Sequence, residues 1–201
     1  MKPNVDVMLS GKREQTKAAN RTAILNAARR VFSELGYGAA TVRDIVRETD
    51  LAAGTFYNYF PDKESVLRAL LDEAASEIRS RVREARKSSR TLEEFVEGGF
   101  RAYYGYMVED TQTFELLRRN AGTIRSMVDE PTVGAGVQEL RDDLAAGIRS
   151  RLLPDHDVDY MAAAMVGAGF EVAVRMLDRD PPDVEGAVEF LTGIFLAGLS
   201  S

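Results

Sequence analysis

Apolar residues recur at three- and four-residue spacing along almost the whole chain, and this spacing restricts the fold more than any other feature. Near the N-terminus the pattern runs through Ile24, Ala28, Val31, Phe32 and Leu35. Side chains at this spacing share one face of an α-helix, whereas no stretch shows the alternation expected of a strand. The sequence therefore predicts an all-α fold of about nine helices.

Composition and breaks in the helical pattern divide the chain into regions. In chain order they are a polar arm expected to be mobile (residues 1–16), a first helical domain (residues 17–62), a long connecting helix (residues 63–90) and a second helical domain (residues 91–201). In the second domain we expect one helix over residues 111–128 and a loop over residues 131–136. No repeat and no low-complexity segment interrupts this order.

The composition excludes several kinds of chemistry. The 201 residues include no Cys and a single His, His156, which rules out disulfides, thiolate zinc sites, cysteine nucleophiles and any triad with a second His. Asp155, Asp157 and Asp159 surround His156. A metal site is one interpretation of this cluster; we favour an exposed loop in which Asp157 caps the next helix. We predict no catalytic residue, no metal and no cofactor.

The distribution of apolar residues also bears on location. Residues 1–15 are polar and contain no apolar run as long as that of a signal peptide. The longest nearly apolar run, residues 161–170, is about half a membrane span. The sequence therefore predicts a cytoplasmic protein without membrane contact.

The charge is unevenly distributed. The formal net charge is −6, which taken alone argues against a nucleic-acid partner. However, residues 1–90 carry 17 Lys and Arg against 12 Asp and Glu, a net of +5, and residues 91–201 carry 9 against 20, a net of −11. Such asymmetry is compatible with polyanion binding by the first part, and also with chance variation in surface charge.

Two short predicted helices joined by a tight turn form a helix-turn-helix. Thr41 opens the first of them, and Asp44 follows three residues on, which is typical of an N-cap with a capping box. The second covers residues 54–60, where only Phe56 and Phe60 fit a core. Its other side chains carry hydroxyls and an amide, which suit hydrogen bonds to phosphates and base edges. We expect this second helix to enter a major groove of DNA.

The order of these residues resembles the DNA-binding domain of the TetR (tetracycline repressor-like) family of bacterial transcriptional regulators. The resemblance spans residues 21–70 and rests on Thr41-Val42-Arg43-Asp44-Ile45-Val46 and Gly54-Thr55-Phe56-Tyr57-Asn58-Tyr59-Phe60-Pro61-Asp62-Lys63-Glu64. It implies a homodimer whose recognition helices lie in successive major grooves of a pseudo-palindromic operator. It also implies a helical C-terminal domain that binds a small-molecule effector and forms the dimer.

The resemblance implies a set of DNA-contacting residues on the two short helices and at the start of the next one: Thr41, Arg43, Gly54, Thr55, Tyr57, Asn58, Tyr59 and Lys63. Thr55 and Asn58 are expected to read bases. Tyr57, Tyr59 and Lys63 are expected to hold phosphates. A phosphate near Lys63 would offset the cost of a cation in the first turn of a helix; a solvated lysine is the alternative.

Two departures from the family pattern qualify the resemblance. Asp50 stands in the turn where the family usually has glycine, and we expect the turn to survive because Asp tolerates a left-handed conformation. Asn58 stands where His is common, so the resemblance does not specify the operator sequence. The basic residues before the first helix face either a minor groove, phosphates or solvent: Lys12, Arg13, Lys17 and Arg21.

In the second domain, small and apolar residues on the last two long helices are compatible with a four-helix bundle made by two chains. The interface residues that we predict are Ala164, Gly167, Ala168, Leu191, Ile194 and Phe195. Aromatic and Met residues in the middle of the chain suit a flat or greasy ligand, although plain core is the alternative for each. The ligand-binding residues that we predict are Phe100, Tyr103, Tyr104, Met107, Phe114, Met127, Met165 and Phe170.

These observations favour a ligand-responsive dimeric DNA-binding regulator, and more specifically a repressor released by a small hydrophobic or amphipathic molecule. A regulator that binds DNA without an inducer and a helical adaptor are the alternatives. An enzyme is disfavoured because the chain has one His, no Cys, no phosphate-cradling glycine loop and no metal-ligand spacing.

Overall fold

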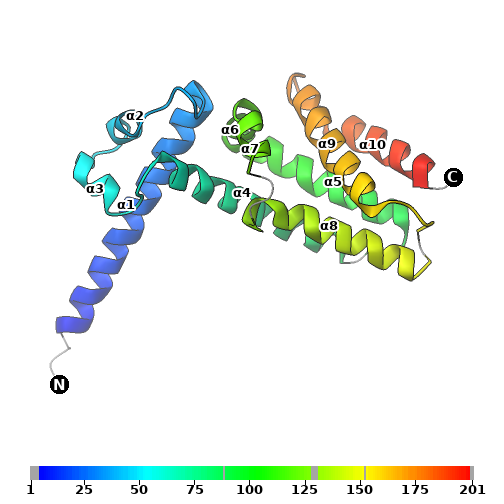
Figure 1. The fold of residues 1–201 in the computed structure, drawn as a ribbon, viewed down its shortest axis with the longest axis horizontal. Helices are drawn as coiled ribbons and strands as arrows, with labels where there is room; N and C mark the ends of the chain where they lie inside the picture. Colours follow the sequence, from blue (N-terminus) through cyan, green and yellow to red (C-terminus); the bar gives the residue numbers. More distant parts are fainter. Residues whose placement is uncertain (1–4, 88, 128–130, 152, 200–201) are drawn as a thin grey trace. The chain divides into compact units, whose positions relative to one another are not determined.

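The structure, a computed structural model, describes residues 5–87, 89–127, 131–151 and 153–199. This part of the chain consists of ten α-helices without a strand (Figure 1), so the all-α prediction is confirmed. The helices are α1 (Val5–Leu35), α2 (Val42–Arg47), α3 (Ala53–Tyr57), α4 (Lys63–Arg86), α5 (Leu92–Glu109), α6 (Thr111–Arg119), α7 (Ala121–Arg125), α8 (Pro131–Arg149), α9 (Val158–Leu177) and α10 (Val184–Leu199).

The largest differences from the helices that the sequence predicts lie in three places. α1 begins at Val5 and includes most of the predicted arm, whose residues 1–4 lie outside the described part. Residues 12–17 are all polar, so they favour a helix without marking a buried face. α8 begins at Pro131 where a loop was expected, because proline suits the first turn of a helix. The single helix expected over residues 111–128 is two helices, with Asn120 between them.

The chain divides into two compact units. The first unit comprises Met1–Leu71 and Glu115–Thr123, and the second comprises Asp72–Phe114 and Ile124–Ser201. The division falls within α4 rather than at either end of the connecting helix. It also assigns Glu115–Thr123, from the predicted second domain, to the unit that holds the helix-turn-helix.

The first unit is built on α1. Figure 1 shows α2 and α3 on one side of α1, and α2 packs against both α1 and α3. Helices of six and five residues are not stable alone, so α2 and α3 depend on the apolar residues that they bury. The largest buried side chains of this unit are Ile24, Phe32, Ile45, Phe56, Leu67, Leu70 and Leu116.

The second unit is a helical bundle in which α5 packs against α10 and α9, and α9 packs against α8 and α10. Gly169 of α9 admits the Phe100 ring of α5, because a Cβ at Gly169 would lie 3.2 Å from it. Among the described residues, α9 alone is long and apolar enough to cross a membrane. This is weak evidence for a membrane-spanning helix, because core helices of soluble proteins have the same length and composition.

Side chains cap the first turns of α5, α9 and α4, and the cap at Asp157 is the one expected from the sequence. Thr91 accepts a hydrogen bond from the Glu94 amide at 3.1 Å, and Asp157 accepts one from the Tyr160 amide at 3.0 Å. At the start of α4, Asp62 accepts one from the Ser65 amide at 2.8 Å. These caps satisfy amides that have no partner within their own helix.

Candidate nucleic-acid interface

Helix α2 begins with the capping box expected from its sequence. The Thr41 hydroxyl accepts a hydrogen bond from the Asp44 amide at 3.2 Å, and the Asp44 carboxylate accepts one from the Thr41 amide at 2.9 Å. Hydrogen bonds from the Thr41 hydroxyl and amide hold the pKa of Asp44 below its ordinary value. Arg43, on the exposed face of α2, keeps its side chain in solvent.

The end of α2 is tied to α1 and to the turn by polar side chains. The Arg30 guanidinium of α1 donates to the Glu48 carbonyl at 3.2 Å. In the turn, Thr49 donates to the Val46 carbonyl at 2.8 Å and accepts from the Leu51 amide at 3.2 Å. Sequence reasoning did not identify Thr49, although Ser and Thr often close turns in this way.

The turn between α2 and α3 does not use a left-handed residue at Asp50. Among the described residues only Gly36 and Arg151 have positive φ values, of 77° and 60°. The turn is present as expected, but the tolerance of Asp for a left-handed conformation is not what allows it. The hydrogen bonds of Thr49 supply the closure instead.

Helix α3 separates its buried and exposed residues as expected for a recognition helix. Phe56 is fully buried and Phe60, just beyond the helix, is nearly so. Tyr57 is 59% exposed, its ring lying edge-on to Phe56. Asn58, which caps the C-terminal end of α3, is exposed. At Gly54 no heavy atom lies within 4 Å of where a Cβ would be, so the backbone is accessible there.

The remaining two predicted α3-region residues, Thr55 and Tyr59, are half-buried. The Tyr59 hydroxyl accepts a hydrogen bond from the Asn20 amide group at 3.1 Å. A tyrosine hydroxyl that accepts one hydrogen bond keeps its own proton to donate, so Tyr59 is oriented by α1 and still able to bind an acceptor such as a phosphate oxygen. Asn20 carried no signal in the sequence, because its partner lies 39 residues away.

Lys63 has internal partners. Its ammonium donates to the carbonyl oxygens of Tyr37 at 2.7 Å and Ala40 at 2.8 Å, and lies 4.4 Å from the centre of the Tyr37 ring. These groups offset the cost of a cation at the start of α4. The argument that Lys63 needs a phosphate is therefore wrong, because the side chain ties α4 to the segment between α1 and α2. A phosphate contact by Lys63 remains a prediction.

The basic residues of α1 fall into two groups. Arg13 and Lys17 are exposed. Arg21 lies over the Phe60 ring at 5.4 Å, so its cation is held beside the end of α3. Lys12 lies in α1, and its side chain is outside the described part of the structure.

Comparison with known proteins identifies this arrangement. The family model for bacterial regulatory proteins of the tetR family matches residues 24–70. The regulator UidR of Escherichia coli strain K12 is 26% identical over 198 residues, covering 91% of this chain and 97% of UidR. The repressor KstR2 of Rhodococcus jostii is 36% identical over 90 residues, covering 43% of this chain and 44% of KstR2.

The chain is a TetR-family transcriptional regulator. The fold agrees: the transcriptional regulator FadR from Bacillus subtilis, solved in complex with stearoyl-CoA, superposes with a TM-score of 0.70. It is 24% identical, and the match covers 85% of this chain and 97% of FadR. At this identity the likeness shows the fold alone.

In this TetR-family chain the predicted ligand-binding residues all belong to the second unit. Phe100 lies 6.0 Å from Tyr104 and 5.8 Å from Phe195, ring centre to ring centre. Phe114 lies 6.4 Å from Phe170. The structure thus gathers these aromatic side chains in two groups; Met107, Met127 and Met165 are buried in the same unit.

The two adjacent tyrosines of α5 differ in their partners. Tyr104 is fully buried and donates a hydrogen bond to the Gly169 carbonyl at 3.1 Å. Tyr103 lies 5.4 Å from the Tyr104 ring. Burial raises the pKa of both hydroxyls, so both stay protonated at neutral pH.

Two of the predicted dimer residues are corrected by the structure. Leu191 is 1% exposed and Phe195 is 7% exposed, because both point into the second unit, where Phe195 stacks on Phe100. They have no surface left for a partner. Ile194 of α10, and Ala164 and Gly167 of α9, are exposed, while Ala168 is half-buried.

The His156 cluster shows a loop rather than a metal site. The His156 Nδ1 atom lies 2.8 Å from the Pro154 carbonyl oxygen, and Asp157 caps α9. Within the described residues no group of three or more His, Cys, Asp or Glu side chains is arranged to hold a metal ion.

Proposed function

We propose that this chain is a homodimeric repressor that leaves a pseudo-palindromic operator when a small hydrophobic or amphipathic effector binds its second unit. The observation that carries the proposal is the helix-turn-helix of α2 and α3. Ile45 and Phe56 are its buried residues, and Arg43, Tyr57 and Asn58 are presented to solvent beside the open backbone of Gly54. Such a surface suits phosphates and base edges.

The role of each residue follows from its placement. Arg43 and the Tyr57 hydroxyl supply donors for phosphate oxygens. Asn58 can pair with a base edge through both its amide donor and its carbonyl acceptor. Tyr59 is held by Asn20 and donates to a neighbouring phosphate. The net charge of +5 in residues 1–90 favours the approach of this part to DNA.

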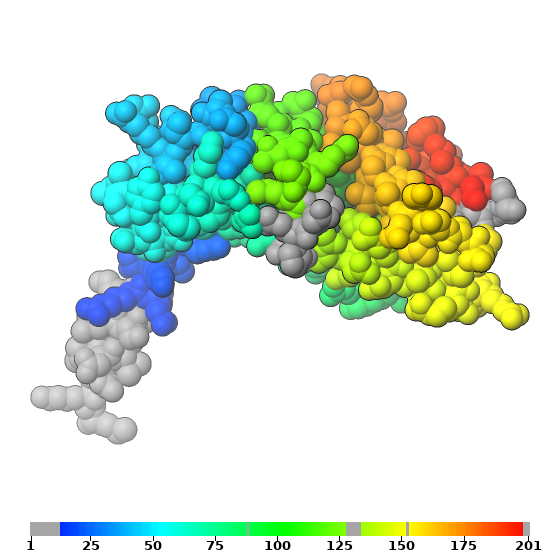
Figure 2. Space-filling model, in the orientation of Figure 1, coloured from blue at the N-terminus to red at the C-terminus, as the bar shows by residue number. Residues whose placement is uncertain are grey.

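The dimer is supported by an exposed apolar surface on α9 and α10, whose atoms lie next to each other in Figure 2. Phe190 is 58% exposed, Ile194 49% and Val166 45%. Small exposed residues between them allow two helices to approach closely: Ala163, Ala164, Gly167, Gly193 and Ala197. A second copy of this surface would cover these apolar side chains in a two-fold arrangement.

The effector class is supported by the side chains of the second unit and by one relative. Phe100, Tyr103, Phe114 and Phe170, together with the buried Met residues, form an apolar environment that can adapt to a long or flat ligand. FadR from Bacillus subtilis, which has this fold, was solved with stearoyl-CoA. We therefore propose long-chain acyl compounds as the first effectors to try.

Release is expected to depend on α4, which begins beside the helix-turn-helix and continues into the second unit. A change in the direction of α4 in each protomer would alter the distance between the two recognition helices. The effector must bind the released state more tightly than the operator-bound state for this to occur. We propose that the chain is not an enzyme and that it works in the cytoplasm, where its DNA is.

The test is the affinity of the full chain for the promoter region beside its own reading frame, measured by fluorescence anisotropy over a salt series. We expect Tyr57→Ala to weaken binding by about 1–3 kcal/mol for the two protomers together, because each loses a hydrogen bond to phosphate. Leu35→Ala is the control, since Leu35 is similarly exposed, at 51%, and lies on α1.

Four results would count against the proposal or a part of it. Binding that is insensitive to salt would exclude phosphate contacts. Wild-type affinity in Tyr57→Ala would show that α3 is not the recognition helix. A monomeric mass by light scattering in the presence of operator would exclude the dimer. Operator binding that no acyl compound changes would favour a regulator without an inducer.

A further inference from the structure

A short segment of the effector-binding half of the sequence is structurally part of the DNA-binding unit. Glu115–Thr123 belongs to the first unit, whereas the chain directly before it and directly after it belongs to the second. The segment includes the last turns of α6 and the start of α7. Helix α6 therefore runs without a break from one unit into the other.

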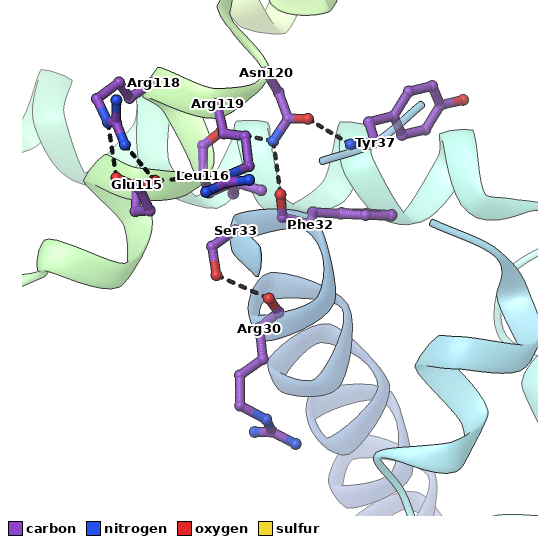
Figure 3. A network of polar contacts seen from close by, with 9 residues as sticks. All are labelled: Arg30, Phe32, Ser33, Tyr37, Glu115, Leu116, Arg118, Arg119 and Asn120. Atoms are coloured by element: carbon purple, nitrogen blue, oxygen red, sulfur yellow. Dashed lines mark hydrogen bonds and ion pairs between the residues drawn. The ribbon is translucent and has the colours of Figure 1, made fainter. Parts of the chain in front are cut away.

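Asn120, in this segment, is buried against the end of α1 (Figure 3). It is 4% exposed. Its amide nitrogen donates to the Phe32 carbonyl at 3.1 Å and to the Leu116 carbonyl at 2.7 Å, and its oxygen accepts from the Tyr37 amide at 2.6 Å. Both N–H groups and the carbonyl of the side chain are thus used.

These contacts close the C-terminal end of α1. Phe32 and Tyr37 lie on either side of Gly36, whose φ of 77° turns the chain out of the helix. The Phe32 carbonyl, which also accepts from the Gly36 amide at 3.2 Å, and the Tyr37 amide face the same point, and the Asn120 side chain bonds to both. A carboxylate lacks the donors for this position and a lysine lacks the acceptor, so an amide side chain is the suitable chemistry.

From Tyr37 the contacts continue to the helix-turn-helix. The Tyr37 carbonyl and the Ala40 carbonyl both accept from the Lys63 ammonium, which also lies over the Tyr37 ring. Ala40 directly precedes Thr41, the N-cap of α2. A series of hydrogen bonds through Asn120, Tyr37 and Lys63 therefore joins α6 to Ala40, the residue directly before the N-cap of α2.

We propose that Asn120 is the positioning residue through which the state of α6 sets the geometry of α2 and α3. The proposal rests on the function proposed above. A hydrogen bond near 3 Å is lost beyond about 3.5 Å, so a shift of α6 of the order of 1 Å withdraws the amide. Tyr37 then loses its partner, the segment before α2 loosens, and the operator is bound more weakly.

The competing explanation is that Asn120 only caps α1. A cap of that kind lowers stability when it is removed and leaves the response to an effector unchanged. If Asn120 carries the coupling, its removal changes the operator affinity of the folded protein and also the ratio of affinities with and without effector. The two explanations therefore differ in the ratio of operator affinities with and without effector, which a change in stability alone does not alter.

The experiment compares the full chain with Asn120→Ala and with the control Gln112→Ala, which removes an exposed amide from α6. Operator affinity is measured well below the unfolding temperature, with and without stearoyl-CoA. We expect Asn120→Ala to weaken operator binding about tenfold without ligand. The ratio of operator affinities without and with stearoyl-CoA should then be close to one. Stearoyl-CoA binding by calorimetry should be unchanged, and Gln112→Ala should match the wild type.

Hydrogen exchange supplies a readout that needs no effector. The Tyr37 amide donates to Asn120, so Asn120→Ala should lose protection at Tyr37 while the amides inside α4 stay protected. Should Asn120→Ala fail to fold, Asn120→Asp keeps the acceptor for Tyr37 and loses the donors to Phe32 and Leu116. It should retain protection at Tyr37 and have intermediate operator affinity.

The outcomes separate this proposal from the one on which it rests. A folded Asn120→Ala variant could match the wild type in operator affinity, in the ratio of affinities with and without effector, and in hydrogen exchange at Tyr37. That result would overturn the role of Asn120 and leave the proposed regulatory function standing. A wild-type chain that binds no operator would overturn the function itself. If stearoyl-CoA does not bind the wild type, the acyl class is contradicted, and the exchange and the affinity without ligand then decide the role of Asn120.

Discussion

The two units are stabilised by different kinds of contact. In the first unit, polar side chains hold the ends of short helices and the segments between them: Thr41, Thr49, Asp62, Lys63 and Asn120. In the second unit, long helices pack through aromatic rings such as Phe100 and Phe195. Ion pairs then join helices at its surface, as between Arg141 and Asp159 at 2.7 Å.

The difference suits the two proposed tasks. Hydrogen bonds are directional and have a narrow range of lengths, so they set the positions of α2 and α3 closely enough for DNA contacts. Apolar packing is less directional, and Met side chains in particular can adopt new rotamers around a ligand. Polar changes should therefore impair the first unit most, and loss of one hydrogen bond in the second unit should matter less.

The largest effect is expected at Lys63. Lys63→Met keeps the length of the side chain and removes the ammonium, which leaves the Tyr37 and Ala40 carbonyls without this donor. Loss of two charge-assisted hydrogen bonds should lower the free energy of unfolding by about 2–4 kcal/mol. Chemical denaturation followed by circular dichroism measures this. The control is Lys17→Met, since Lys17 is exposed on α1.

The Lys63 result would also test the comparison directly. If Lys63→Met unfolds at the wild-type denaturant concentration, the polar contacts of the first unit are not what stabilises it. If stability falls as expected, the restoring variant Lys63→Arg, which brings back a cation and its donors, should recover part of the loss.

The features that the sequence predicted correctly depend on near neighbours. The caps at Thr41 and Asp157 each bond to an amide three residues on. The buried positions Phe56 and Phe60 follow from the same local pattern. Helix propensity and capping act within a few residues, so a single sequence contains the information needed to predict them.

The features that sequence reasoning missed depend on partners far along the chain. Lys63 bonds to residues 23 and 26 positions away, and Asn120 bonds to residues 83 and 88 positions away. Leu191 and Phe195 lie on an apolar helix face, and only the packing with α5 shows that they point inward. Tertiary contacts of this kind leave no spacing signal in one sequence.

A smaller effect is expected from Tyr104 in the second unit. Tyr104→Phe removes the hydrogen bond to the Gly169 carbonyl and keeps the ring packed on Phe100. We expect the free energy of unfolding to fall by about 1 kcal/mol with operator affinity unchanged. Tyr103→Phe is the matched control, because no hydrogen bond of its hydroxyl is found within the described residues. A loss of operator binding in Tyr104→Phe would contradict the separation of tasks between the units.

The smallest effect is expected from acid, through the caps of the first unit. Hydrogen bonds from Thr41 lower the pKa of Asp44, and those from Ser65 lower the pKa of Asp62. A carboxyl group whose pKa is lower in the folded state stabilises the fold above its unfolded pKa, near 4. That contribution is lost as the pH falls through the folded pKa.

Thermal unfolding of the full chain between pH 5 and about pH 2.5 should therefore show a falling midpoint, to which Asp44 contributes. Asp44→Asn removes the titrating group and keeps an acceptor for the Thr41 amide, so its midpoint should fall less steeply over the same range. Because the Asp44 carboxylate is partly exposed to solvent, the difference in slope should be small. Equal slopes for the wild type and Asp44→Asn would mean that the capping box of α2 does not depend on its charge. The first unit would then be held by its neutral hydrogen bonds and by Lys63.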